Sequence, residues 1–224
     1  MNISYTNIHS HFLIENDAIG IKNSSTNFSD FTTAKYCSIG IHPWYIKEKI
    51  VEQELFYIQQ NSIANNVLAI GECGLDKLSE VDFQLQKNMF IAQLKISEQV
   101  KKPVIIHCVK AFDELIKIKK ELNLTVPLIV HGYNNNKQIA EQLIKNGFYI
   151  SFGKALLKPN SNAVKVISKI PMDKLFLETD DEDVSIKCIF EVASALLIVN
   201  KDELKEKIFS NFIKTFNINL SFRP

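Results

Sequence analysis

The chain has 224 residues, of which 46% are hydrophobic and 23% are charged, and its formal net charge is +1. These values fit one globular domain with a full core over residues 1–224, and they exclude a whole-protein field that attracts nucleic acid or membranes. No apolar stretch approaches the roughly 20 residues of a membrane span, and the N-terminus does not resemble a signal peptide. We therefore expect a cytoplasmic enzyme, monomeric and without a membrane partner.

Short β-rich runs alternate with helix-like segments along the chain. Strands are predicted at 5–9, 18–22, 35–41, 67–71, 103–107, 128–131, 148–152 and 174–178. Helices are predicted at 82–101, 112–122, 136–145, 162–170, 186–199 and 201–216, with Asp202 placed to cap the last one. This alternation predicts a parallel sheet, and eight strands predict closure into a (β/α)8 TIM barrel. The segment between the first two strands is too short for a helix, so one helix is expected to be missing there.

All the histidines lie where a predicted strand ends, and two carboxylates follow strands in the same way. These residues are His9, His11, His42, Glu72, His107, His131 and Asp180. Because the carboxyl ends of barrel strands meet at one face, we expect these side chains to share one cavity. Imidazole and carboxylate groups together are typical of a divalent-metal site.

Each of these residues also has a structural explanation. Paired histidines can face solvent at a turn, and His107 or His131 can be a core histidine satisfied by the backbone. Glu72 can cap a helix, and Asp180 can belong to a solvated acidic loop. A metal site is favoured over these separate explanations, because they would require several unrelated residues to lie at strand ends by coincidence. The cysteines form no CxxC pair and are expected to be free thiols without a catalytic role.

The strand ends carry a series of short motifs over most of the chain. In order they are His9-Ser10-His11, Gly40-Ile41-His42-Pro43, Gly71-Glu72-Cys73-Gly74-Leu75-Asp76, Gln84-Leu85-Gln86, Pro103-Val104-Ile105-Ile106-His107, His131-Gly132 and Glu178-Thr179-Asp180. This series resembles the TatD-related deoxyribonuclease family, a branch of the metal-dependent amidohydrolase-type barrels. The resemblance implies two divalent cations (Mg²⁺, Mn²⁺ or Zn²⁺) and a phosphodiester or nucleic-acid substrate.

The resemblance also implies which residues hold these cations. The first cation would be held by His9, His11, Glu72 and Asp180. The second would be held by His107 and His131, with Glu72 bridging the two. Bound metals would lower the pKa of water and polarise the phosphoryl oxygen. Asp180 would then orient that water and act as general base, so that Asp180 and Glu72 are the expected catalytic residues.

Four further residues are candidates for contact with substrate. His42 has no metal partner in the pattern and is expected to face substrate, or else to be structural before Pro43. Lys110 and Lys154 are candidate phosphate contacts, with solvated lysines as the alternative. Tyr133, like Trp44, is placed to stack on a base or to pack at the barrel mouth.

This sequence departs from the family pattern near the substrate. Asn7 stands where the family has an Asp that would tune a ligand histidine. Val109 stands where the family often has an Arg, and Lys110, a point charge without a bidentate fork, follows it. The metal ligands are therefore predicted to be intact and the substrate contacts altered. Two alternatives stay open: a barrel hydrolase of esters, lactones or amides, and a metal-binding protein with little catalysis.

Overall fold

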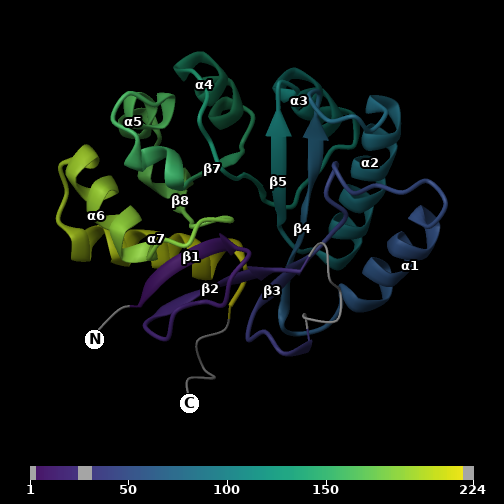
Figure 1. Cartoon of the computed structure of the whole chain (residues 1–224), viewed down its shortest axis with the longest axis horizontal. Coiled ribbons are helices and arrows are strands. Elements are labelled where there is room, and N and C mark those ends of the chain that lie inside the picture. The colour runs from purple at the N-terminus through teal and green to yellow at the C-terminus, as the bar shows by residue number, and fades with distance from the viewer. Residues whose placement is uncertain (1–3, 25–31, 219–224) are drawn as a thin grey trace.

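The computed structural model describes residues 4–24 and 32–218. In this part of the chain, eight parallel strands form one sheet, and their order in the sheet follows their order in the chain (Figure 1). The strands are β1 (Tyr5–Ser10), β2 (Ala18–Asn23), β3 (Cys37–Ile39), β4 (Val67–Asp76), β5 (Val104–Val109), β6 (Leu128–Val130), β7 (Tyr149–Phe152) and β8 (Leu175–Leu177). Every neighbouring pair is parallel, from β1–β2 to β7–β8. This order confirms the predicted TIM barrel.

Helices surround the strands, with α1 and α2 on the right of Figure 1 and α5 and α6 on the left. They are α1 (Val51–Asn61), α2 (Phe83–Val100), α3 (Phe112–Glu121), α4 (Lys137–Lys145), α5 (Asn162–Val166), α6 (Ile186–Leu197) and α7 (Lys201–Thr215). Short 3₁₀ turns cover Lys154–Leu157, Ile167–Lys169 and Met172–Lys174. As predicted, no helix joins β1 to β2, since a loop at residues 11–17 connects them. Within the described ranges, no helix is both long enough and apolar enough to cross a membrane.

The barrel closes through backbone hydrogen bonds between β1 and the segment just after β8. The amides of Thr179 and Asp180 donate to the carbonyl oxygen of His9, at 3.3 and 3.0 Å. The amide of His11 donates to the carbonyl oxygen of Asp180 at 2.9 Å. Asn7 reinforces this seam, because its side chain donates to the Thr179 hydroxyl and accepts from the Thr179 amide. The closure therefore places the first two histidines beside Asp180.

Buried apolar runs form the strands, as expected for a parallel sheet covered on both faces. Every residue of β6 and β8 is buried. The pairing of β4 with β5 depends on Gly74, whose φ is +152°. A Cβ at this position would lie 1.9 Å from the carbonyl oxygen of His107, so only glycine lets the two backbones approach. This contact fixes where His107 enters the barrel mouth.

Several predicted boundaries need correction. Strands β4 and β5 continue to Asp76 and Val109, so Glu72 lies inside a strand and not after it, and His107 lies before the end of its strand. Helix α1 was not predicted, and the segment predicted as one helix at 162–170 is α5 followed by a 3₁₀ turn. The cap of α7 is Asn200, whose side chain accepts a hydrogen bond from the Asp202 amide. Asp202 itself lies within the first turn of the helix.

Candidate metal centre

Glu72 lies at the centre of the predicted site, and one of its oxygens, Oε1, faces three imidazoles. Oε1 lies 2.8 Å from Nε2 of His131. It also lies 3.1 Å from Nε2 of His42 and 3.2 Å from Nδ1 of His107. Strand β5 and the segments that follow β3 and β6 therefore direct ring nitrogens at one carboxylate oxygen.

The other oxygen of Glu72, Oε2, faces the closing seam of the barrel. It lies 3.4 Å from Nε2 of both His9 and His11. The same two nitrogens lie 3.4 and 3.5 Å from Oδ1 of Asp180. Asn23, at the end of β2, donates from Nδ2 to Oε2 at 3.0 Å, and its Oδ1 accepts from the Glu72 amide. All six predicted metal ligands thus converge, and Asn23 holds their shared carboxylate.

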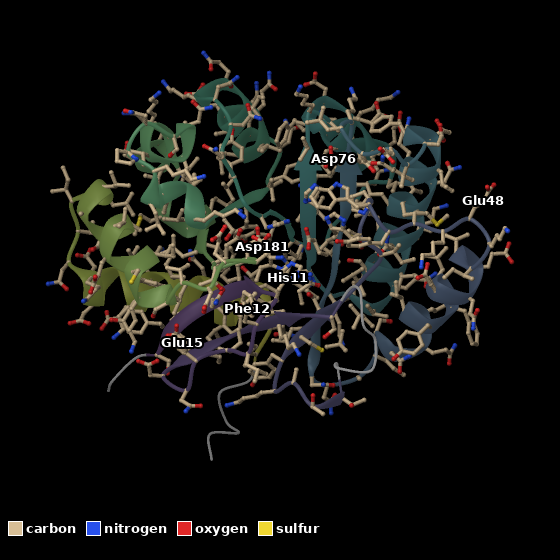
Figure 2. All side chains as sticks on the ribbon, in the orientation of Figure 1. His11, Phe12, Glu15, Glu48, Asp76 and Asp181 are labelled. Carbon is tan, nitrogen blue, oxygen red and sulfur yellow. The ribbon has the colours of Figure 1, made fainter. Side chains whose placement is uncertain are left out.

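A cavity of about 330 Å³ opens over these groups at the barrel mouth. Its lining comprises His11, His42, Trp44, Tyr45, Glu72, His107, Cys108, Val109, His131, Gly132, Asp180 and Asp181. Figure 2 shows His11 and Asp181 near the centre of the view, with Asp76 above them. Among the described residues, this lining contains carboxylates and imidazoles but no lysine or arginine.

The carboxylates and imidazoles shift one another's pKa values in opposite directions. Burial alone would raise the pKa of Glu72, but His131, His107 and His11 hold it well below its ordinary value. Burial likewise opposes the effect of His9 on Asp180, whose pKa is nevertheless lowered.

The histidines show the converse effect. Burial and the nearby His131 lower the pKa of His9, but Asp180 and Glu72 outweigh them and raise it to about 9. Burial also lowers the pKa of His131, but Glu72 and Glu178 raise it well above its ordinary value. The cluster is therefore a place where positive charge is strongly favoured.

His9 provides the clearest test of whether a metal ion fits this site. Its ring is fully buried, and neither ring nitrogen has a hydrogen-bond partner among the described residues. Its Nε2 lies 3.4 Å from both Glu72 and Asp180, too far for a good hydrogen bond. An orphaned nitrogen between two carboxylates is costly unless a cation joins them.

Among the described residues, three groups of side chains could each hold a metal ion. Within each group, one possible ligand atom from every residue lies within 4.8 Å of the others. The groups are His9–His11–Asp180, His9–Glu72–His131 and His42–Glu72–His107. Mixed imidazole and carboxylate donors of this kind suit divalent ions such as Zn²⁺ or Mn²⁺. The residues present therefore fit a divalent metal.

Asp76, the last residue of β4, orients His107. Its Oδ2 lies 3.1 Å from Nε2 of His107 and also accepts from Nε1 of Trp44 at 2.7 Å. Burial raises the pKa of Asp76, but Trp44, the Leu78 amide and His107 outweigh this and lower it. A His107 ring that donates from Nε2 to this carboxylate would carry no proton on Nδ1 in its neutral form. The lone pair of His107 Nδ1 then points at Glu72, an arrangement that calls for a cation between them.

Glu178 holds His131 in a similar way. This fully buried carboxylate accepts from the Gly132 amide at 2.6 Å and lies 3.4 Å from Nδ1 of His131. Neither Asp76 nor Glu178 was predicted as a functional residue, although Asp76 ends the motif that begins at Gly71 and Glu178 begins the motif that ends at Asp180. Asn23 was also missed, and only its position at the end of a predicted strand could have indicated it.

His42 differs from the other histidines in its hydrogen bonds. The backbone amide of Trp44 donates to Nδ1 of His42 at 3.1 Å. Nδ1 is therefore an acceptor, so in the neutral ring Nε2 carries the proton and faces Glu72 as a donor. Burial lowers the pKa of His42, which favours this neutral form. Although His42 is near enough to bind a metal, its hydrogen bonds suit donation better than ligation.

Two other residues predicted to contact substrate, Tyr133 and Lys110, do not line the cavity. Tyr133 is buried, donates its hydroxyl to the Asn136 carbonyl and packs near Phe112 and Phe152, which fits the packing alternative for this residue. Lys110 is exposed and does not line the cavity.

Lys154 lies beside the cavity but is bound by two acidic side chains. It donates to Asp181 at 2.6 Å and lies 3.1 Å from Glu182. Val109, in contrast, lines the cavity, where the family pattern often has an Arg. Asn7 contacts Thr179 across the barrel seam through both polar atoms of its side-chain amide. No disulfide joins two cysteines of the described residues.

Comparison with known proteins relates this site to one family. A model of the family described as TatD related DNase matches residues 11–217. The uncharacterized metal-dependent hydrolase YabD of Bacillus subtilis is 30% identical over 200 residues, which cover 82% of this chain and 78% of YabD. The uncharacterized metal-dependent hydrolase YjjV of Escherichia coli is 28% identical, over 82% of this chain and 77% of YjjV.

Solved structures agree on the fold. The crystal structure of YjjV, a TatD homologue from Escherichia coli, superposes with a TM-score of 0.83 at 24% identity and covers 98% of this chain and 100% of that one. A TatD-family hydrolase from Entamoeba histolytica has a TM-score of 0.77 at 18% identity, with coverage of 96% and 98%. The family match extends over nearly the whole barrel and includes most of the converging ligands. The chain therefore belongs to the TatD-related DNase family.

Proposed function

We propose that this chain is a metal-dependent phosphodiesterase that acts on nucleic acid and uses two divalent ions. The observation that carries the proposal is the position of Glu72, whose two oxygens face imidazoles from opposite sides of the barrel. A carboxylate placed in this way is suited to bridge two ions. Membership of the TatD-related DNase family supports a phosphodiester substrate.

The ligands divide naturally around the two oxygens of Glu72. His9, His11 and Asp180 would hold one ion on the Oε2 side, and His107 with His131 would hold the other on the Oε1 side. Divalent ions bound there supply Lewis acidity, which polarises a phosphoryl oxygen and lowers the pKa of water. Asp76 and Glu178 keep the rings of His107 and His131 in the orientation that this binding needs.

Two side chains are proposed to act on the reacting groups. Asp180 is partly exposed to the cavity and its lowered pKa keeps it ionised, so it can orient a water and accept its proton. His42 holds a proton on Nε2 at the cavity wall and can donate it to a phosphoryl or leaving-group oxygen.

Among the described residues, the cavity lining offers no lysine or arginine to a phosphate. The charge of a phosphodiester must then be offset by the bound ions, so we expect turnover to depend strictly on metal. Asp181, which lines the same cavity, is already paired with Lys154.

A metal-supplemented nuclease assay tests this proposal. Single- and double-stranded DNA with either end blocked is incubated with the protein and Mg²⁺, Mn²⁺ or Zn²⁺. Cleavage that requires the metal is expected, and it should be abolished by Asp180→Asn with the fold retained. Asp183→Asn, an exposed change in the same loop, is the matched control and should retain activity. Full activity in Asp180→Asn would refute its role as the base.

A further inference from the structure

An open groove adjoins the catalytic cavity on the side of β3, β4 and β5. It measures about 630 Å³ and is walled by Trp44, Leu78, Val81 and Val109, with Ser79 and Glu80 at its rim. Two of these residues, Trp44 and Val109, also line the catalytic cavity. The groove therefore adjoins the cavity at Trp44 and Val109, close enough for a substrate in the cavity to reach it.

Trp44 forms the boundary between the two spaces and is half exposed, with a relative accessibility of 50%. Its indole nitrogen donates to Asp76 at 2.7 Å, which fixes the orientation of the ring. The neighbouring rings of His42, His107 and Tyr45 meet it at steep angles of 79°, 74° and 78°. Among the described aromatic residues, none of these contacts is a parallel stack on the indole.

An oriented and half-exposed indole beside a metal centre is suited to receive a planar ring. Its orientation is already held by Asp76, so little conformational entropy is lost on binding. Leu78 is 64% exposed and, with Val81 and Val109, offers apolar surface to the same ring. The charged side chains of the groove are acidic, so a phosphate group is disfavoured there.

We propose that this groove binds the base of the nucleotide adjoining the scissile phosphodiester, stacked on Trp44. The proposal rests on the proposed function, because it assumes a nucleotide substrate. Base–aromatic stacking tolerates all bases, and it contributes roughly a factor of 10 in affinity. The groove would then favour substrates that carry a base and would not select a sequence.

The chain contains a single tryptophan, so its tryptophan fluorescence, excited apart from the tyrosines, reports on Trp44 alone. The full protein in Mg²⁺ buffer is titrated with thymidine 5′-monophosphate and, separately, with 2-deoxyribose 5-phosphate. The nucleotide is expected to change the fluorescence with saturation, whereas the sugar phosphate, which lacks a base, is not. An equal response to both compounds, or no response to the nucleotide, would overturn the proposal.

Two exposed leucines provide a matched pair of variants. Leu78→Ser removes apolar surface from the groove and should weaken nucleotide affinity about fivefold. Leu157→Ser changes a leucine that lines neither the cavity nor the groove and should leave the affinity unchanged. Equal nucleotide affinity in the two variants would contradict the proposal that the groove binds the base.

The outcomes also separate this proposal from the proposed function. A saturable nucleotide response without hydrolysis of any phosphodiester would support the groove and refute the nuclease activity. Hydrolysis of phosphodiesters without a change in tryptophan fluorescence would refute the groove alone.

Discussion

Replacing Asp76 by Asn tests whether this carboxylate positions a metal ligand. Oδ2 of Asp76 faces two ring nitrogens, Nε1 of Trp44 at 2.7 Å and Nε2 of His107 at 3.1 Å. Oδ1 accepts from the Leu78 amide at 2.7 Å. An Asn side chain has nearly the same shape but keeps only one acceptor oxygen. The variant should therefore fold while changing the environment of His107.

The size of the effect follows from these contacts. With the amide oxygen facing Trp44 and His107, the amide nitrogen meets the Leu78 N–H, and the lost hydrogen bond costs about 1 kcal/mol of stability. His107 then donates to a neutral oxygen and becomes a weaker metal ligand. Loss of such a supporting carboxylate typically lowers metal affinity by about 10- to 100-fold, or about 1.4 to 2.7 kcal/mol.

Metal affinity is measured by competition with a chromophoric chelator, and stability by urea unfolding of the metal-free protein. Asp202→Asn makes the same chemical change on exposed α7 and is the matched control, since the Asp202 side chain is 82% exposed. A folded Asp76→Asn variant that binds metal as tightly as the unchanged protein would refute the reasoning.

Three further predictions concern charge and stability. Glu72→Gln should bind less metal than the unchanged protein after dialysis, and an unchanged stoichiometry by elemental analysis would refute the bridging role. Burial raises the pKa of Glu98, but Lys101 and Thr125 hold it at about 2, below its ordinary value of 4.5. The stabilising effect of Glu98 is thus full above pH 4.5 and is lost as the pH falls toward 2. Glu98→Gln should reduce the pH dependence of the free energy of unfolding over this range. The same pH dependence in the variant and the unchanged protein would contradict this role of Glu98. Asn200→Ala should destabilise the protein by about 1 kcal/mol through loss of the α7 cap, and an unchanged melting temperature would argue against that cap.

Elements with a strong apolar pattern could be predicted from the sequence, and elements without one could not. The helix at 82–101 was predicted because its polar and apolar residues alternate at helical spacing, and α2 (Phe83–Val100) differs from it by one residue at each end. Helix α1 buries only Val51 and Ile58 and exposes Phe56, so it has no continuous apolar stripe. The predicted strand at 67–71 ends with its apolar run, whereas β4 continues through Glu72 to Asp76.

The convergence of the proposed metal ligands could be predicted because their positions depend on topology alone. The carboxyl ends of parallel strands meet at one face, whatever the intervening helices do. The roles of Asp76, Glu178 and Asn23 depend instead on which side chain of another strand or loop each one contacts, and the sequence does not indicate that partner. The tautomer of His42 likewise depends on one backbone amide of the following loop. Tyr133, two residues after His131, is buried, and the sequence alone left stacking and packing open for it.

The central claim is that this barrel cleaves phosphodiesters with the help of divalent ions held around Glu72. The most direct test is to strip the protein of metal, restore Mn²⁺, Mg²⁺ or Zn²⁺, and compare turnover of bis-p-nitrophenyl phosphate with that of simple esters and lactones. We predict hydrolysis of the phosphodiester that is absent in chelator and restored by metal. Turnover of esters or lactones with the phosphodiester left intact, or phosphodiester hydrolysis unaffected by chelation, would contradict the claim.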